Sequence, residues 1–168
     1  MKPFINIQSA YFDAVTSVLE MDVAPLTGNP RHYHTLFAKT ITVINGELLV
    51  GKDKVTTILT TGQEIHIPIG STNFFKNKSD KICRVRITLD PGSSDFEDAM
   101  NIYYGLKQDG LISKKGVPKK LIHAAIFARL SNSKMTGFRT IPDFLLNVIA
   151  NLAIKNGQLE ALRDKYTI

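Results

Sequence analysis

Residues 32–77 read HYHTLFAKTITVINGELLVGKDKVTTILTTGQEIHIPIGSTNFFKN. Alternate side chains of a β-strand share a face, so His32 and His34 can direct two imidazole rings at one point. Asn45-Gly46 separates two runs of strand-forming residues, and an Asn-Gly pair in that position indicates a β-hairpin. Pro68-Ile69-Gly70 ends a later strand, because proline cannot donate a ladder hydrogen bond and glycine permits the turn. The stretch therefore predicts short strands that carry two histidines on one face.

The spacing of these residues resembles the two sequence motifs of the cupin superfamily. In the first motif, His32 and His34 are followed after four residues by Lys39 and after six more by Gly46. The second motif is a glycine, five residues, Pro-x-Gly, two residues, a histidine, three residues and an asparagine. The corresponding residues here are Gly62, Pro68-Ile69-Gly70, Asn73 and Asn77. The resemblance is strong over residues 30–92 and weaker over the helical tail that many bacterial single-domain cupins carry. It implies a mainly β fold, a double-stranded β-helix (jelly-roll barrel), followed by C-terminal α-helices.

Two positions depart from the cupin pattern. The resemblance implies a metal site made by both histidines of the first motif, its glutamate and a histidine of the second motif. Lys39 stands at the glutamate position and Asn73 at the second histidine position. An ammonium group repels a divalent cation that a carboxylate would attract. We therefore expect no metal or other cofactor in the barrel; if a metal does bind, the candidate ligands are His32, His34 and His66.

Turn signals divide the first part of the chain into short strands, which is typical of a β-sandwich or barrel. Strands are predicted over residues 4–8, 14–24, 38–44, 47–51, 54–60, 64–68, 73–76 and 82–89. After Asp90-Pro91-Gly92 the apolar period becomes helical. We predict a barrel over residues 1–92 and a helical extension over 93–168, which packs on the barrel or on a dimer partner.

Four helices are predicted in the extension. The first begins near Ser94, and Gly105 and Gly110 mark its end. The second begins at Pro118, the third begins at Pro142, and a short fourth covers 158–165. The second and third helices are expected to carry apolar faces that include Leu121, Ile122, Phe144, Leu145, Val148 and Leu152. His123 is expected at the surface. Apolar helix faces and open edge strands both need cover, so we predict a homodimer.

The composition is that of a globular protein. The chain has 168 residues, of which 43% are hydrophobic and 21% charged. Its single cysteine, Cys83, cannot form an internal disulfide, and no secretory leader or membrane-length apolar run is evident, so we expect a cytoplasmic protein. The net charge of +6 is dispersed and comes without a nucleic-acid-binding motif. We therefore expect no nucleic-acid or membrane partner, and a preference for a small anionic molecule.

Lys39 and Asn73 each allow two interpretations. The Lys39 ammonium group either enters the barrel, where it would bind an anion or a carbonyl oxygen, or reaches water at the rim. A Schiff-base role for Lys39 would require desolvation that lowers its pKa. Asn73 either hydrogen-bonds a ligand or shapes the turn after Pro-x-Gly. The predicted ligand-binding residues are His32, His34, Lys39 and Asn73.

These residues favour a barrel that binds a small polar or anionic molecule, either as a ligand only or also as a substrate. Two alternatives belong to other classes: a metal-dependent cupin enzyme such as a dioxygenase or isomerase, and a non-catalytic sensor or interaction protein. No specific reaction follows from the sequence, and the catalytic residues are unknown.

Overall fold

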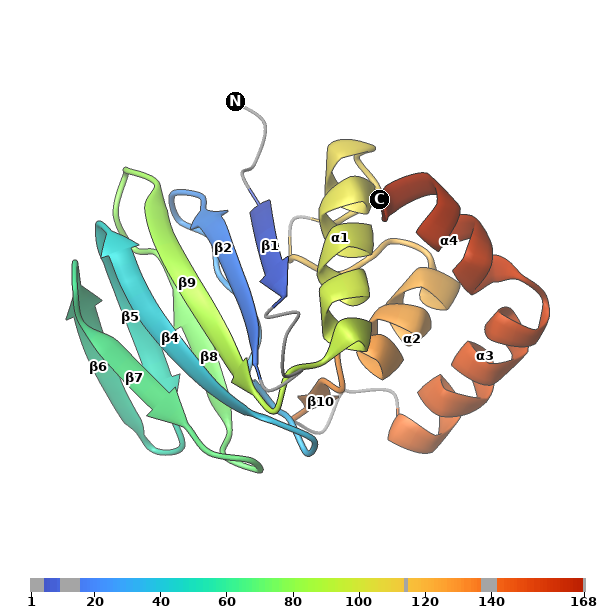
Figure 1. Ribbon diagram of the computed structural model, residues 1–168, viewed down its shortest axis with the longest axis horizontal. Coiled ribbons are helices and arrows are strands. Elements are labelled where there is room, and N and C mark those ends of the chain that lie inside the picture. Colours follow the sequence, from blue (N-terminus) through green and yellow to red (C-terminus); the bar gives the residue numbers. More distant parts are fainter. Residues whose placement is uncertain (1–4, 10–15, 114, 137–141, 168) are drawn as a thin grey trace. The chain divides into compact units, whose positions relative to one another are not determined.

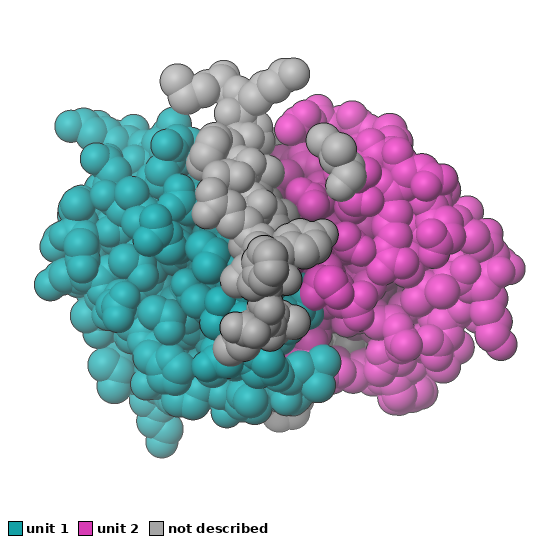
Figure 2. Space-filling view, in the orientation of Figure 1, with its two compact units in different colours: residues 1–93 teal, residues 94–168 magenta. Residues whose placement is uncertain are grey.

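The computed structural model describes residues 5–9, 16–113, 115–136 and 142–167. The chain divides into two compact units, Met1–Ser93 and Ser94–Ile168 (Figure 2). The first unit is built of β-strands, and the second is mainly helical (Figure 1). None of the helices in the described part of the chain has the length and hydrophobicity needed to cross a lipid bilayer.

Two antiparallel sheets form the first unit. In one sheet the strand order is β1 (Ile5–Ser9), β2 (Ser17–Val23), β9 (Cys83–Asp90), β4 (Ala38–Asn45) and β7 (Glu64–Ile67). In the other sheet β3 (His32–Tyr33), β8 (Asn73–Lys76), β5 (Glu47–Lys52) and β6 (Val55–Thr60) lie side by side in that order. Between β6 and β9 the chain alternates between the sheets, as in a jelly roll. The prediction of a mainly β fold, a jelly-roll double-stranded β-helix followed by C-terminal helices, is confirmed. Residues 4, 14 and 15 of the predicted first strands lie outside the described residues.

Side chains alternate between the core and the outer face along the long strands. In β2, β4 and β9 every second residue is buried, and β9 contributes Cys83, Val85, Ile87 and Leu89. The thiol of Cys83 is fully buried, and burial raises its pKa to about 11. The buried positions of β4 are Lys39, Ile41 and Val43, so the same alternation that builds the apolar core also directs one lysine inward.

The predicted hairpin at Asn45-Gly46 is wrong. Strands β4 and β5 belong to different sheets, and Gly46 lies at the corner where the chain passes from one to the other. Gly46 has φ +99°, and a Cβ at this position would lie 3.2 Å from the Cα of Cys83. An Asn-Gly pair supplies the positive φ that either a hairpin or a corner needs, so the local signal is the same for both. The adjacent hairpin joins β5 to β6 instead, and Asp53 in its turn has φ 51°.

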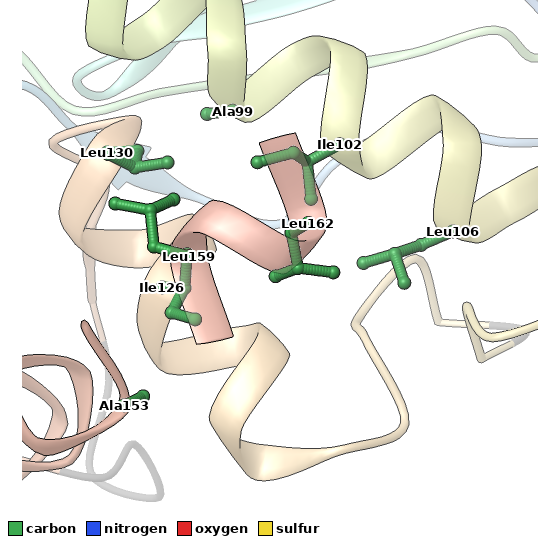
Figure 3. Packing of buried hydrophobic residues seen from close by; sticks show 8 residues of the cluster. All are labelled: Ala99, Ile102, Leu106, Ile126, Leu130, Ala153, Leu159 and Leu162. Carbon is green, nitrogen blue, oxygen red and sulfur yellow. The ribbon is translucent and has the colours of Figure 1, made fainter. Parts of the chain in front are cut away.

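The second unit packs four helices around its own apolar core. They are α1 (Ser94–Gln108), α2 (Leu121–Leu130), α3 (Asp143–Lys155) and α4 (Gln158–Tyr166), with a short strand β10 (Lys134–Met135) between α2 and α3. Figure 3 shows the buried cluster to which all four helices contribute: Ala99, Ile102, Leu106, Ile126, Leu130, Ala153, Leu159 and Leu162.

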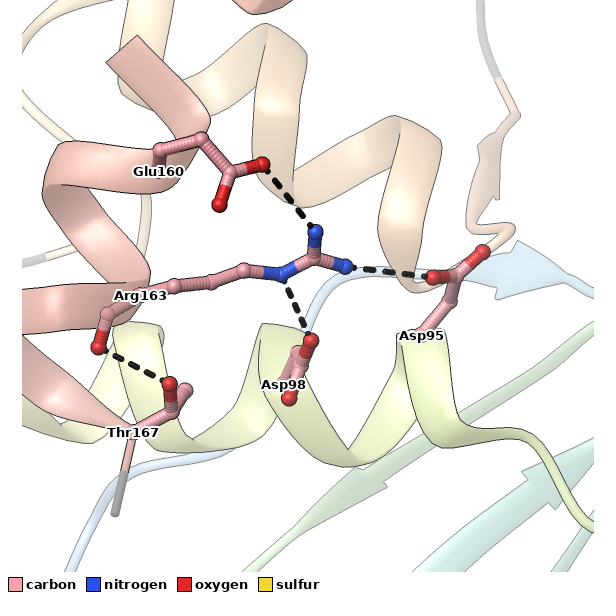
Figure 4. Close-up of polar contacts among 5 residues, drawn as sticks. All are labelled: Asp95, Asp98, Glu160, Arg163 and Thr167. Atoms are coloured by element: carbon pink, nitrogen blue, oxygen red, sulfur yellow. Dashed lines mark hydrogen bonds and ion pairs between the residues drawn. The ribbon is translucent and has the colours of Figure 1, made fainter. Parts of the chain in front are cut away.

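Charged side chains connect α4 to α1 at the edge of this cluster. The guanidinium group of Arg163 lies 2.8 Å from Asp98 and 3.6 Å from Asp95 of α1, and 3.5 Å from Glu160 of its own helix (Figure 4). Nearby, Tyr166 donates a 2.6 Å hydrogen bond to Asp109. Because these groups are partly exposed, the pairs contribute little to stability and mainly fix the orientation of α4.

Three details of the predicted helices are wrong. Helix α1 ends at Gln108, close to Gly110 as predicted, but it continues through Gly105, where the ring of Tyr166 packs so closely that a side chain would clash. Helix α2 begins at Leu121, not at Pro118, because Pro118 forms a β-bridge with Ile112. His123 is only 8% exposed, whereas Leu121 and Ile122 of the predicted apolar face of α2 are exposed.

On α3 the buried positions are Ala150 and Ala153. The larger apolar side chains predicted for this helix lie at the surface: Phe144, Leu145, Val148 and Leu152. The helix itself begins at Asp143, with Pro142 as its N-cap residue, as the position of the proline predicts. The third helix therefore presents an apolar face to solvent in the single chain.

Candidate functional site

The four predicted site residues lie inside the first unit and form one connected group. His32 is in β3, His34 follows it, Lys39 is in β4 and Asn73 is in β8. All four side chains are buried, and Lys39 is only 3% exposed. The first sheet thus contributes the lysine, while the second sheet and the segment after β3 contribute the other three.

His32 is held in one tautomer by a backbone contact. Its Nδ1 atom lies 2.8 Å from the carbonyl oxygen of Pro30, which can only accept, so Nδ1 carries the hydrogen. The Nε2 atom therefore presents a lone pair. Lys39 Nζ lies 3.5 Å from it and donates a long, weak hydrogen bond. Among the described residues, Nε2 of His32 is the only hydrogen-bond partner of Lys39 Nζ.

Lys39 lies in apolar surroundings on its own sheet. Its neighbours across the strands are Leu89 of β9 and Ile67 of β7, both buried. Burial lowers the pKa of Lys39 from 10.5 to about 7. Near neutral pH the side chain is therefore a mixture of ammonium and free amine. The interpretation that placed Lys39 at the rim is wrong, because its position in the alternation of β4 faces the core.

His32 remains a neutral acceptor over the same pH range. Burial is the largest cause that lowers its pKa from 6.5 to about 3, and the nearby charge of Lys39 lowers it further. The hydrogen bond to Pro30 acts in the opposite direction. Of the two residues in contact, Lys39 is the one that changes its charge near pH 7.

His34 is positioned by rings and by the second motif. Its imidazole meets His32 edge-on, with ring centroids 4.8 Å apart, and lies over Phe37 at the same centroid distance. The backbone amide of Gly70 donates a 2.8 Å hydrogen bond to the carbonyl oxygen of His34. Gly70 has φ +82°, which explains why the Pro-x-Gly turn ends in glycine. The second motif thus fixes the backbone of the first.

Asn73 links strands β3 and β8, and its side-chain oxygen has no donor among the described residues. It is fully buried in β8 opposite His32, and its Nδ2 atom donates a 3.1 Å hydrogen bond to the carbonyl oxygen of His32. The interpretation of Asn73 as a turn residue is therefore wrong. Its Oδ1 atom is buried and has no hydrogen-bond partner among the described residues. A buried acceptor left unpaired costs about 1–3 kcal/mol, so this oxygen favours a ligand or water that donates to it.

His66 lies on the opposite face of the sheet from Lys39. It pairs in register with Thr40 of β4, and its Nδ1 atom contacts the Thr40 hydroxyl at 3.2 Å. The His66 side chain is exposed, while the flanking Ile67 faces the core. His66 is therefore unable to join His32 and His34 in a metal site.

The side chains at this site do not fit a divalent metal ion. Within the described ranges no group of three or more His, Cys, Asp or Glu residues is placed to hold one. The neutral His32, with Nδ1 bonded to a carbonyl group, resembles a metal ligand in its orientation. Its Nε2 lone pair, however, faces Lys39 Nζ, which places a cationic group where a metal would bind.

Sequence reasoning missed one participant, the carbonyl group of Pro30, which selects the tautomer of His32. A backbone acceptor leaves no trace in residue identity, so only the structure reveals it. Phe37 is 2% exposed and packs against the ring of His34.

Comparison with known proteins gives likeness of fold at low sequence identity. No protein-family model and no curated protein matches the sequence. Among solved structures, the protein TT1209 from Thermus thermophilus is 16% identical, with a TM-score of 0.47 over 52% of this chain and 84% of that chain. The cupin domain of Cnp3 from Schizosaccharomyces pombe is 11% identical, with a TM-score of 0.48 over 60% of this chain and 68% of that chain. An oxalate oxidase in complex with the substrate analogue glycolate is 20% identical, with a TM-score of 0.46 over 53% of this chain and 51% of that chain.

Proposed function

We propose that the first unit binds a small anionic molecule beside Lys39. The observation that carries the proposal is the burial of Lys39 Nζ with no ion pair among the described residues, only the long contact to His32. A buried charge without a counter-charge is costly. An anion in contact with Nζ would supply that counter-charge and would favour the ammonium form.

The neighbouring groups indicate what else the ligand carries. Asn73 Oδ1 is a buried acceptor that needs a donor, and a hydroxyl group would supply one. The neutral imidazole ring of His32 and the buried ring of His34 add polar surface. A small acid that also carries a hydroxyl group therefore suits the site better than a simple inorganic anion. The metal-dependent alternative receives no support from these side chains, because the lysine and the amide replace two ligands.

The proposal is tested by calorimetric titration with lactate, acetate and phosphate at pH 6.5. We expect lactate to bind most tightly and Lys39→Met to weaken its binding at least about tenfold, the effect of losing one charge-assisted hydrogen bond. Lys54→Met is the matched control, because Lys54 is exposed in the turn between β5 and β6. Absence of binding by all three anions, or equal affinity in Lys39→Met and wild type, would overturn the proposal.

A further inference from the structure

Lys39 has the features of a nucleophilic amine. A lysine attacks a carbonyl carbon only as the free amine, and desolvation is one of the ways proteins produce that form near neutral pH. Lys39 Nζ is buried, and its strand neighbours Leu89 and Ile67 are apolar. With its pKa lowered to about 7, a large share of Lys39 is unprotonated at pH 7.

A proton acceptor lies next to that amine. Nε2 of His32 faces Nζ at 3.5 Å, and the bond from Nδ1 to Pro30 prevents the ring from presenting a hydrogen on this side. Proton transfer to and from a positioned imidazole assists the addition and dehydration steps of imine formation. The pair thus holds an amine in contact with a weakly basic imidazole, and both side chains are buried.

We propose that Lys39 Nζ forms a Schiff base with the carbonyl carbon of a small 2-oxo acid. This inference rests on the proposed function, since the same site must first admit the anion. The Nζ lone pair forms the new C–N bond, and the electrons of the C=O π bond move to oxygen. His32 Nε2 relays the proton that Nζ loses to that oxygen, which gives a carbinolamine. A second proton, taken from solvent, lets the hydroxyl group leave as water: the C–O bond breaks and the nitrogen lone pair forms the C=N bond. Amine, ketone and one proton therefore give a protonated imine and water, without an oxidant or reductant.

The charge balance favours a 2-oxo acid over a plain aldehyde. A protonated imine keeps the positive charge at Nζ, and among the described residues no carboxylate forms an ion pair with that atom. The carboxylate group of a 2-oxo acid is bonded directly to the imine carbon, so it neutralises the positive charge within the adduct itself. A neutral aldehyde would leave an uncompensated buried cation, which is unfavourable.

The test uses pyruvate as the probe and sodium cyanoborohydride to reduce the imine to a stable amine. After incubation of the full chain at pH 7, intact mass and peptide mapping locate the adduct. We expect Lys39 to be modified at least roughly tenfold faster than any exposed lysine, because its free-amine fraction is on the order of a thousandfold larger. Lys39→Met should lose this adduct, and Lys54→Met should retain it.

Lactate separates the inference from the proposed function, because it has the size and charge of pyruvate but no carbonyl carbon to attack. Lactate should bind, should slow trapping of pyruvate and should itself give no adduct. Lys39-dependent binding of both acids without modification of Lys39 would overturn the Schiff base and leave anion binding intact. Failure of both acids to bind would overturn both proposals, and adducts confined to exposed lysines would also overturn the inference.

Discussion

Replacing Lys39 with methionine should change how stability depends on pH. Lys39 has a pKa of about 7 in the folded protein and 10.5 as its ordinary value. Below pH 7 the lysine is protonated in both the folded and unfolded states, and the folded state bears the full cost of the buried charge. As the pH rises from 7 towards 10.5, the folded state has already lost the proton while the unfolded state still binds it. The free energy of unfolding of the wild type therefore rises with pH in this window.

The magnitude follows from the two pKa values. Each pKa unit corresponds to about 1.4 kcal/mol, so the cost below pH 7 is on the order of 5 kcal/mol. Between pH 7 and pH 9 about 2 kcal/mol of this cost should disappear. Lys39→Met removes the cost but leaves Nε2 of His32 without its donor, which costs about 1–3 kcal/mol. The net gain of Lys39→Met at pH 7 is thus smaller than the full charge term, and its loss of pH dependence is the clearer signal.

The assay is urea unfolding followed by circular dichroism at several pH values from 7 to 9. The range stops there because Cys83 has its pKa raised to about 11, so ionisation of its thiol in the unfolded state lowers stability above about pH 9. We expect the wild type and Lys54→Met to gain stability with pH, and Lys39→Met to lack that gain. Equal pH dependence in Lys39→Met and wild type would refute the placement of Lys39 in the core.

Three further predictions concern metal, pH and assembly. Wild-type protein purified without chelator should contain far less than one equivalent of Zn, Ni, Mn or Fe by elemental analysis, and tightly held stoichiometric metal would contradict this. Lys39→Glu combined with Asn73→His should create metal binding. Lactate binds the ammonium form of Lys39, so its affinity should be constant below pH 7 and should weaken by up to about tenfold per pH unit above pH 7. Constant affinity from pH 6 to pH 9 in calorimetry would be inconsistent with Lys39 as the anion-binding group. We also propose that the chain is a homodimer whose interface covers Phe144 and Val148 of α3, which are 66% and 52% exposed in the single chain. Light scattering at micromolar concentration should give a dimer mass, and Phe144→Glu should reduce it. A monomer mass in the wild type would rule this out.

Most of the first unit could be predicted from local signals. The cupin-like spacing and the alternation of apolar residues placed the strands within a few residues, because both signals are properties of the strand itself. The corner at Gly46 was misassigned because the sheet that the next strand joins is decided by distant pairings, such as those of β4 with β9 and of β5 with β8. Local sequence contains no information of that kind.

The orientation of single side chains was the other limit. Alternation shows that Lys39 and Thr40 face opposite ways, but only the pairing of Lys39 with Leu89 and Ile67 shows which one faces the core. The same uncertainty affected His123, because an apolar stripe gives the period of a helix but not its rotation about the axis. The candidate residues were therefore found from sequence, while their contacts and charge states required the structure.

Titration of Lys39 by NMR tests the central claim most directly. The protein would carry lysine labelled with ¹³C at Cε, with Lys39→Met used to assign the signal, and the pH would be varied with and without lactate. We predict a midpoint near pH 7 that moves upward when lactate is present, because a bound anion favours the ammonium form. A midpoint near the ordinary lysine value of 10.5, unchanged by lactate, would contradict both the buried amine and its role in binding an anion.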